Sequence, residues 1–480
     1  MLARLEQRLA DALAVAAGQE QRIAELEGQV AQLQRRLSRN SGNSSMPPSS
    51  DGVLPGVAVP EPAPKRVAGR RRGRQPGAPG AALSWTAAPD RVVDHRPDGG
   101  CGGCGAGLGD AVQVGVDRAC QVTDVPLLTS TVTEHRMHAV RCRCGRRTVA
   151  AAPAEADADT PCVYGPNLRA LAVYLLVVHA VPVQRVGRLI TDVTGARPSD
   201  GFVHSMLTAT ATRLVDATQA IRAALSASPV VHFDETPVKV GPRGQRSYIW
   251  VACTARYTLF HLGARSIPAF TAWGLGPHLR GVVVHDNYAV YDSAAAIPDP
   301  VAHQLCTAHL LRHLTDAAQQ HPHATWPHTI TEALQALIHA HHQARDAGHP
   351  AIPAPIAGPL HAAYTRAVAA GLTDLPRRPA GRQPPGRTLL ELLDTSADDV
   401  LRFTTDTRIP PTNNQAEADL RPHKTQQKIS GRLTSEPITR HRLTIRGYIS
   451  TAIKHGRDAI TTLREVHLGI PWIPPQPAGP

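Results

Sequence analysis

Four strand-like runs follow one another in the middle of the chain, and they constrain the fold more than any other feature. Each is rich in Val, Ile or aromatic residues, and turn residues separate them, as in consecutive β-strands. The runs are VVHFDETPVKV (230–240), SYIWVACTA (247–255), YTLFHLG (257–263) and GVVVHDNYAVY (281–291). Helical patterns precede them at 160–228 and follow them at about 303–400, 413–424 and 436–464. This order predicts an α/β catalytic core that a helical insertion interrupts.

The chain has 480 residues and a formal net charge of +12. Its length suits roughly two to four domains. The excess of cations favours an anionic partner, nucleic acid first and a membrane surface second, although a basic protein can also simply be soluble. Eight cysteines are too few for a disulfide-rich secreted scaffold. The apolar run at 168–181 is too short to span a bilayer. We therefore expect a cytoplasmic protein without a signal peptide.

Residues 1–38 carry a heptad repeat that predicts a coiled coil. Its a and d positions are apolar except for Gln19, a pattern typical of helices that pair along one seam. We expect the coil to join two or more copies of the chain; the alternative is one amphipathic helix that packs on its own protein. The a and d positions are Leu2, Leu5, Leu9, Ala12, Ala16, Gln19, Ile23, Leu26, Val30, Leu33 and Leu37.

Residues 39–96 are rich in Pro, Gly and Ser, and they predict a disordered basic linker. Within it, residues 61–80 hold six cations and one acid. A flexible cationic segment suits contacts with DNA phosphates, and a solubilising linker has the same composition. The residues that we expect to contact DNA are Arg70, Arg71, Arg72 and Arg74.

Two cysteine pairs predict a zinc-binding module over residues 97–150. Cys101 and Cys104 form one CxxC pair on a Gly-rich turn, and Cys142 and Cys144 form a less usual CxC pair. Four thiolates would complete a tetrahedral structural zinc site. The alternative is that one pair does not bind metal and that other side chains replace it. The candidates for replacement are Cys120, His135 and His138.

Residues 160–228 predict a helical domain. Its stretch VQRVGRLITDVTGARPSDGFVHSML contains two helical runs joined by a Gly/Pro turn. That arrangement is typical of a helix-turn-helix that reads DNA. Many helix pairs joined in this way are plain packing units, so both interpretations stay open.

Asp234 and Asp286 each lie where a strand-like run is expected to end, in VVHFDET and GVVVHDNY. A carboxylate at the end of a strand is held firmly while its side chain leaves the packed sheet. Two such acids can share Mg²⁺ ions that promote phosphoryl transfer. The alternative for either acid is a turn or capping role, and Glu235 and Asp292 are neighbouring competitors.

Glu417 lies in the segment TNNQAEADLRP, and two roles fit it. With Asn414 as N-cap, Glu417 would be the third helical residue of a capping box. The cationic stretch that follows favours a metal ligand beside a bound phosphate backbone. Arg421, Lys424 and Lys428 follow Glu417 at helical spacing.

A further motif, HQLCTAHLLRHL, contains Cys306 and His309. Its Cys-x-x-His spacing could hold a metal, but two ligands on one helix do not make a site. We expect these side chains to pack or hydrogen-bond near the second aspartate.

In combination, these segments resemble the transposases of the insertion sequence 66 family of bacterial mobile elements. The resemblance rests on the leucine-rich coil, NSSMPPSSDG, GRQPGAPG, HFDET, GVVVHDNYAVY, HQLCTAHLLRHL, TNNQAEADLRP and KISGR, in that order. It implies an RNase H-like catalytic domain over 229–432, with a helical insertion at about 315–405. A C-terminal helix and Pro-rich tail would occupy 433–480. The implied Asp-Asp-Glu triad is Asp234, Asp286 and Glu417.

The resemblance also implies an activity. Two Mg²⁺ ions, or Mn²⁺ ions, would support cleavage at the ends of the element and strand transfer into target DNA. Arg421, Lys424, Lys428 and Arg432 would hold phosphates, and accessory proteins of the same element would assist a nucleoid-associated enzyme. Two other interpretations remain: an RNase H-like nuclease or resolvase without strand transfer, and an inactive zinc and coiled-coil DNA-binding regulator.

Overall fold

The computed structural model describes residues 84–477 except 98, 126–127, 154–159, 161, 243, 245, 380, 382, 385 and 434, together with scattered positions between 15 and 34. The chain divides into two compact units. One unit contains Met1–Val57 and Thr129–Pro480, and the other is Ala58–Leu128. No helix in the described part of the chain is long and apolar enough to cross a membrane.

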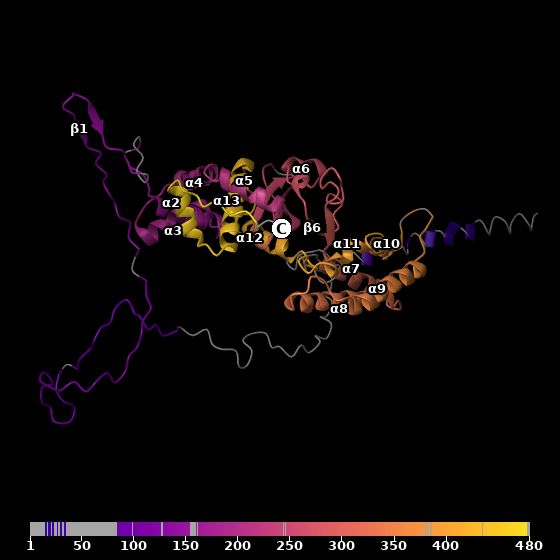
Figure 1. Ribbon diagram of the computed structural model, residues 1–480, viewed down its shortest axis with the longest axis horizontal. Helices are drawn as coiled ribbons and strands as arrows, with labels where there is room; N and C mark the ends of the chain where they lie inside the picture. Colours follow the sequence, from indigo (N-terminus) through magenta and orange to yellow (C-terminus); the bar gives the residue numbers. More distant parts are fainter. Residues whose placement is uncertain are drawn as a thin grey trace, which may run out of the picture. The chain divides into compact units, whose positions relative to one another are not determined.

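The larger unit contains a five-stranded mixed sheet in the order β5-β4-β3-β6-β7. Figure 1 labels its strand β6. Strands β3 to β5 are antiparallel neighbours, whereas β6 and β7 run parallel to β3. The strands are β3 (Val230–Val238), β4 (Ser247–Cys253), β5 (Thr258–Gly263), β6 (Val282–His285) and β7 (Ala302–Leu305). This mixed sheet among many helices confirms the predicted α/β class.

The fourth predicted strand is shorter than expected, because β6 ends at His285 and a turn region follows it. The fifth strand, β7, was not expected, since its residues lie where the helical pattern was predicted to begin. Gln304 explains how so short a strand is held. Its side chain donates to the carbonyls of Leu305 and Val400 and accepts from the backbone N–H of Phe403, so contacts distant in sequence stabilise it.

The sheet buries a different set of side chains on each face. One face packs against helix α6 (Ile267–Trp273), with Phe233, Trp250 and Phe270 in its core. The other face packs against α12 (Asn414–Ser430) and α13 (Glu436–Lys454), which contribute Leu420 and Leu443.

The approach of α13 to β5 depends on a glycine. A Cβ on Gly447 would lie 2.9 Å from the carbonyl oxygen of Thr258, closer than packed atoms allow. Any larger residue at this position would therefore push the helix away from the sheet.

Between residues 166 and 226, four helices lead into the sheet: α2 (Pro166–Val177), α3 (Val183–Thr194), α4 (Asp200–Thr212) and α5 (Val215–Ser226). Gly195, in the left-handed conformation, ends α3, and the Ser199 hydroxyl caps α4. The core of α2 to α4 also contains side chains of α13 and α14 (Ala459–His467), so the last helices complete the first ones. The helix-turn-helix function stays a prediction.

The insertion between β7 and α12 is helical, as predicted, and it has a hydrophobic core of its own. Figure 1 shows its helices as an orange group beside the sheet. They are α7 (Thr307–Gln320), α8 (Trp326–Asp346), α9 (Ala354–Asp374), α10 (Arg387–Thr395) and α11 (Ala397–Leu401). The chain then returns through the 3-10 turn Arg402–Thr404.

The described positions between 15 and 34 are helical. Among the heptad residues, Ile23, Leu26, Val30 and Leu33 are exposed. An exposed apolar stripe is what a coiled coil would bury, but pairing of chains stays a prediction.

Candidate active site

Asp234 lies inside β3 and not at its end, so that expectation is wrong. The reason is that β3 has partners of different length on its two sides. Its parallel pairing with β6 stops at His232, whereas its antiparallel pairing with β4 continues to Val238. Asp234 therefore lies just beyond the point where the pairing of β3 with β6 ends.

Asp286 directly follows β6, as predicted. Burial raises the pKa of its carboxyl to about 7, and the charge of Glu235 adds to the rise while Arg265 opposes it. Within the part of the chain that the structure describes, the buried Oδ1 atom of Asp286 has no hydrogen-bond partner. A buried, unpaired carboxylate oxygen is costly and calls for a cation or a proton.

Glu417 occupies the first turn of α12 and is half-buried. Its charge acts on Asp234, which brings the three predicted acids into one electrostatic group. Burial raises the pKa of Asp234 well above its ordinary value. The negative charges of Glu235, Asp286 and Glu417 raise this pKa further.

The capping box predicted for Asn414 and Glu417 is wrong. The helix begins at Asn414, one residue earlier than the capping box requires. Its N-cap residue is Asn413, whose side chain does not cap it. Instead, Nδ2 of Asn413 donates to the carbonyl of Phe233 at 2.6 Å, and Oδ1 lies 3.0 Å from Nδ1 of His232. The side chain therefore joins the start of α12 to β3 at His232 and Phe233, the two residues before Asp234.

Cys306 and His309 pack beside the site, in agreement with the packing interpretation. Cys306 precedes α7, and its Sγ atom accepts a hydrogen bond of 3.1 Å from the backbone N–H of Asn413. Burial raises the pKa of the Cys306 thiol. Burial, together with the nearby Arg312, lowers the pKa of His309 to about 4 and keeps its imidazole neutral.

A family model described as Transposase IS66 family matches residues 161–438, more than half of the chain. The chain belongs to the IS66 transposase family. A second model, a family of unknown function (DUF6444), matches residues 4–84. No curated protein matches the sequence. The protein is therefore a transposase, and DNA is its substrate.

Glu235, a competitor of Asp234, has partners of its own in this transposase. Its Oε1 atom lies 2.7 Å from Arg265 Nη2, and its Oε2 accepts a 2.6 Å hydrogen bond from the Tyr291 hydroxyl. The Arg265 guanidinium also lies over the Tyr288 ring, 3.8 Å from its centre. Glu235 thus holds the loop after β6 against the segment after β5. Sequence reasoning missed Arg265 and Tyr291 because neither carries a local signal.

An ion pair with α13 also anchors α12. Lys454 Nζ lies 2.6 Å from Asp419 Oδ2, and both side chains are largely buried. The same ammonium group donates to the hydroxyl of Thr258 at 2.7 Å and to the carbonyl of Thr254 at 2.8 Å. This network ties α12 and α13 to β5 and so helps to hold the helix that carries Glu417.

The predicted phosphate-binding residues lie in different surroundings. Arg421, Lys424 and Lys428 are exposed on α12. Arg432 follows the helix, and its Nη1 donates to the carbonyls of Gly241 and Pro242. The predicted DNA contacts of Arg70, Arg71, Arg72 and Arg74 lie outside the described residues.

The cysteine pairs each occupy a tight turn. In the Ala58–Leu128 unit, hydrogen bonds from the backbone of Gly103 and then Cys104 lower the pKa of Cys101. In the larger unit, β1 (Ala139–Arg141) and β2 (Arg147–Val149) form a hairpin whose turn carries Cys142 and Cys144. Backbone hydrogen bonding from Cys144 lowers the pKa of Cys142. Each turn therefore favours the thiolate form that zinc requires, and zinc binding stays a prediction.

Proposed function

We propose that this transposase cleaves DNA at the ends of its element and joins the ends to target DNA through Asp234, Asp286 and Glu417. The observation that supports the proposal is that the charges of Asp286 and Glu417 both act on the carboxyl of Asp234. Folding gathers carboxyl groups from β3, the end of β6 and α12 although their charges repel. Such a cluster costs stability unless cations offset the repulsion.

The residues fit magnesium. Their ligand atoms are hard carboxylate oxygens, which Mg²⁺ prefers, and the unpaired Oδ1 of Asp286 is available. Asp234 would be a ligand of both ions, and Asp286 and Glu417 would each be a ligand of one. The ions, when bound, supply activation of the attacking oxygen and charge neutralisation at the leaving oxygen.

The protein's own residues would orient the reactants. Asn413 and Lys454 hold α12 in place, and the exposed cations of that helix would bind the phosphates beside the scissile bond. Manganese would substitute for magnesium at the same oxygen ligands.

We also propose that the core is RNase H-like. Support comes from an antiparallel three-stranded part that continues into two parallel strands, with Asp234 in β3 and Asp286 directly after the adjacent strand β6. In this scheme the four cysteines bind zinc, helices α3 and α4 help to recognise the element's ends, and the N-terminal coil pairs two protomers.

The test is incubation of the purified protein and Mg²⁺ with labelled DNA that carries the element's ends. Cleavage with joining supports the proposal, whereas cleavage alone indicates a nuclease or resolvase. Asp234→Asn and Glu417→Gln are expected to abolish both steps. Glu332→Gln, an exposed acid on α8, is the matched control and is expected to keep them. Full activity of Asp234→Asn would overturn the assignment, and DNA binding without any cleavage would favour the regulator.

A further inference from the structure

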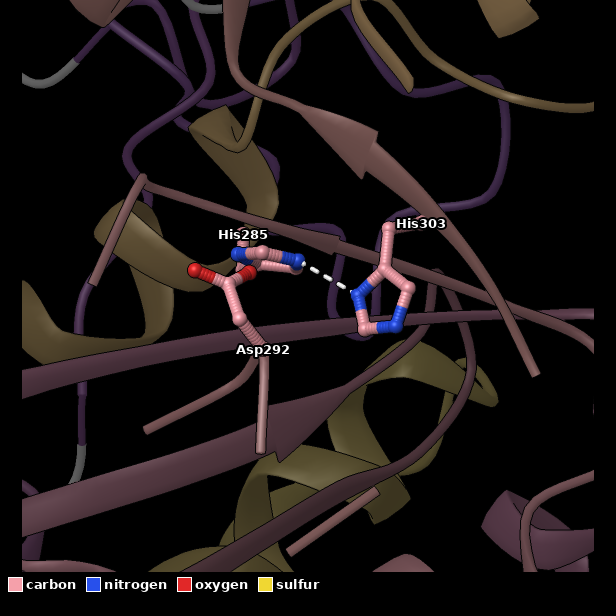
Figure 2. Close-up of side chains that lie close together, drawn as sticks. All are labelled: His285, Asp292 and His303. Carbon is pink, nitrogen blue, oxygen red and sulfur yellow. Dashed lines mark hydrogen bonds between the residues drawn. The ribbon is translucent and has the colours of Figure 1, made fainter. Parts of the chain in front are cut away.

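Outside the carboxylate group, three side chains that can bind metal converge on the loop after β6. They are His285 at the end of β6, Asp292 in the loop, and His303 in β7 (Figure 2). One ligand atom from each side chain lies within 4.8 Å of the other two. His285 is buried, His303 is half-buried and Asp292 is exposed, so the group opens towards solvent on one side.

The hydrogen bonds of His285 show which of its two ring nitrogens could bind a metal. Its Nδ1 is bonded to the backbone carbonyl of Asp286, which can only accept, so Nδ1 carries the proton. Nε2 is therefore unprotonated, and it faces Nδ1 of His303 at 2.9 Å (Figure 2). Metal-binding histidines are oriented in this same way, with the second ring nitrogen donating to a backbone carbonyl.

The separation of the two nitrogens suits a shared cation. With metal–nitrogen bonds of about 2.0–2.1 Å, ligands 2.9 Å apart subtend roughly 90° at the metal. The His303 backbone is held as well, because Arg402 Nε donates to its carbonyl at 2.7 Å. Both imidazoles are thus placed by contacts that do not depend on a metal.

We propose that His285, His303 and Asp292 bind a divalent cation of the zinc class, separately from the magnesium ions proposed above. Two imidazoles and one carboxylate favour zinc, cobalt or nickel over magnesium, which prefers oxygen ligands. Without metal, Nδ1–H of His303 donates to His285. With metal, His303 carries its proton on Nε2 instead, and water completes the coordination on the exposed side.

The cation would link residues that lie before and after Asp286 in the chain. His285 lies directly before Asp286, Asp292 follows it within the loop, and His303 lies on the neighbouring strand β7. The site would therefore support the position of Asp286 without contacting DNA. It would add stability to the metal-bound protein according to the ordinary linkage between binding and folding.

The experiment is a Co²⁺ titration of the full-length, metal-stripped protein. The parent carries Cys101→Ser, Cys104→Ser, Cys142→Ser and Cys144→Ser, so that thiolate sites cannot contribute. Excess Mg²⁺ is present to occupy the carboxylate oxygens. We expect one Co²⁺ per chain, with visible d–d absorption and no thiolate charge-transfer band, and a rise in melting temperature that Zn²⁺ reproduces.

Two variants and two controls decide the result. His303→Asn is expected to lose the bound Co²⁺, and Asp292→Asn, at an exposed position, to weaken binding by about tenfold or more. His339→Asn, an exposed histidine on α8, is expected to keep binding unchanged. Asp234→Asn is expected to keep it too, which separates this site from the proposed magnesium site. Equal Co²⁺ binding by His303→Asn, or none by the folded parent, would show a hydrogen-bonded histidine pair only.

Discussion

The side chain of Asn413 lies 3.0 Å from His232, a residue 181 positions earlier in the chain. With its second hydrogen bond, to the carbonyl of Phe233, Asn413 joins the helix of Glu417 to the strand of Asp234. All of these groups are buried, and the amide of Asn413 helps to fix the position of α12 relative to β3.

Asn413→Ala should therefore reduce both stability and turnover. It leaves a buried carbonyl and a buried imidazole without their partner. Each loss should lower the free energy of unfolding by about 1–3 kcal/mol. A small shift of α12 should lower the rate of DNA cleavage by up to about 100-fold. Chemical unfolding and single-turnover cleavage at a temperature where the variant stays folded would measure the two effects. The exposed neighbour Asn414→Ala is the control, and equal losses in both variants would contradict the positioning role.

Asp234→Asn should make the metal-free protein more stable while it removes cleavage. Burial and neighbouring acids disfavour the charged form of Asp234, and an amide of the same shape has no charge to bury. We expect a gain of roughly 1–3 kcal/mol in urea unfolding at pH 8 with a chelator present. Glu332→Gln should change stability by less than about 0.5 kcal/mol. A loss of stability in Asp234→Asn would argue against the repulsion.

Magnesium binding should strengthen as the pH rises through about 7, the pKa of Asp286. Below this pH the carboxyl holds a proton that competes with the cation, at up to about tenfold in affinity per pH unit. The rise in melting temperature caused by Mg²⁺ should thus be larger at pH 8 than at pH 6. Equal shifts at both pH values would count against Asp286 as a ligand.

In the metal-free protein, the contribution of Asp286 to stability changes with pH in the opposite direction to magnesium binding. The folded-state pKa of Asp286 lies above its ordinary value of 3.8, so the folded protein binds more protons between about pH 4 and 7. The contribution of Asp286 to stability falls as the pH rises through that window. Comparison of the protein with Asp286→Asn in a chelator isolates this contribution, because other titrating groups are common to both.

Arg265→Ala should destabilise the loop after β6. It leaves the Glu235 carboxylate, whose side chain is 3 % exposed, without its cation. Because the Arg265 side chain is 39 % exposed, we expect the free energy of unfolding to fall by about 1–3 kcal/mol, less than for a fully buried pair. The double variant Arg265→Ala/Glu235→Gln should recover part of the loss, as a double-mutant cycle would report. Additive losses would mean that the two side chains are not coupled.

Lys454→Met should lower the free energy of unfolding by more than Arg265→Ala does, about 3–5 kcal/mol, because Asp419 would be left charged among buried groups. Thermal unfolding would measure the loss. Adding Asp419→Asn should restore part of it, and if it restored nothing, the ion pair would not be the source. Cleavage should fall with Lys454→Met even at temperatures where the protein is folded, since α12 loses an anchor.

Local sequence patterns determined the strands β3 to β5, the helical insertion and the position of Asp286 directly after a strand. These features depend on side-chain periodicity and turn residues, which neighbouring residues suffice to encode. The heptad repeat and the cysteine pairs likewise indicate local elements, and the segments from HFDET to KISGR indicated the family that the comparison confirmed.

Only the tertiary structure decided how these elements meet. Strand β7 exists because Gln304 finds partners about a hundred residues away, and Asp234 lies within its strand because β4 continues where β6 stops. The amide of Asn413, which local rules assign to capping, instead bonds across the core to β3. The convergence of His285 and His303 follows from strand register. Register and long-range hydrogen bonds depend on how whole surfaces pack, and no short window of sequence contains that information.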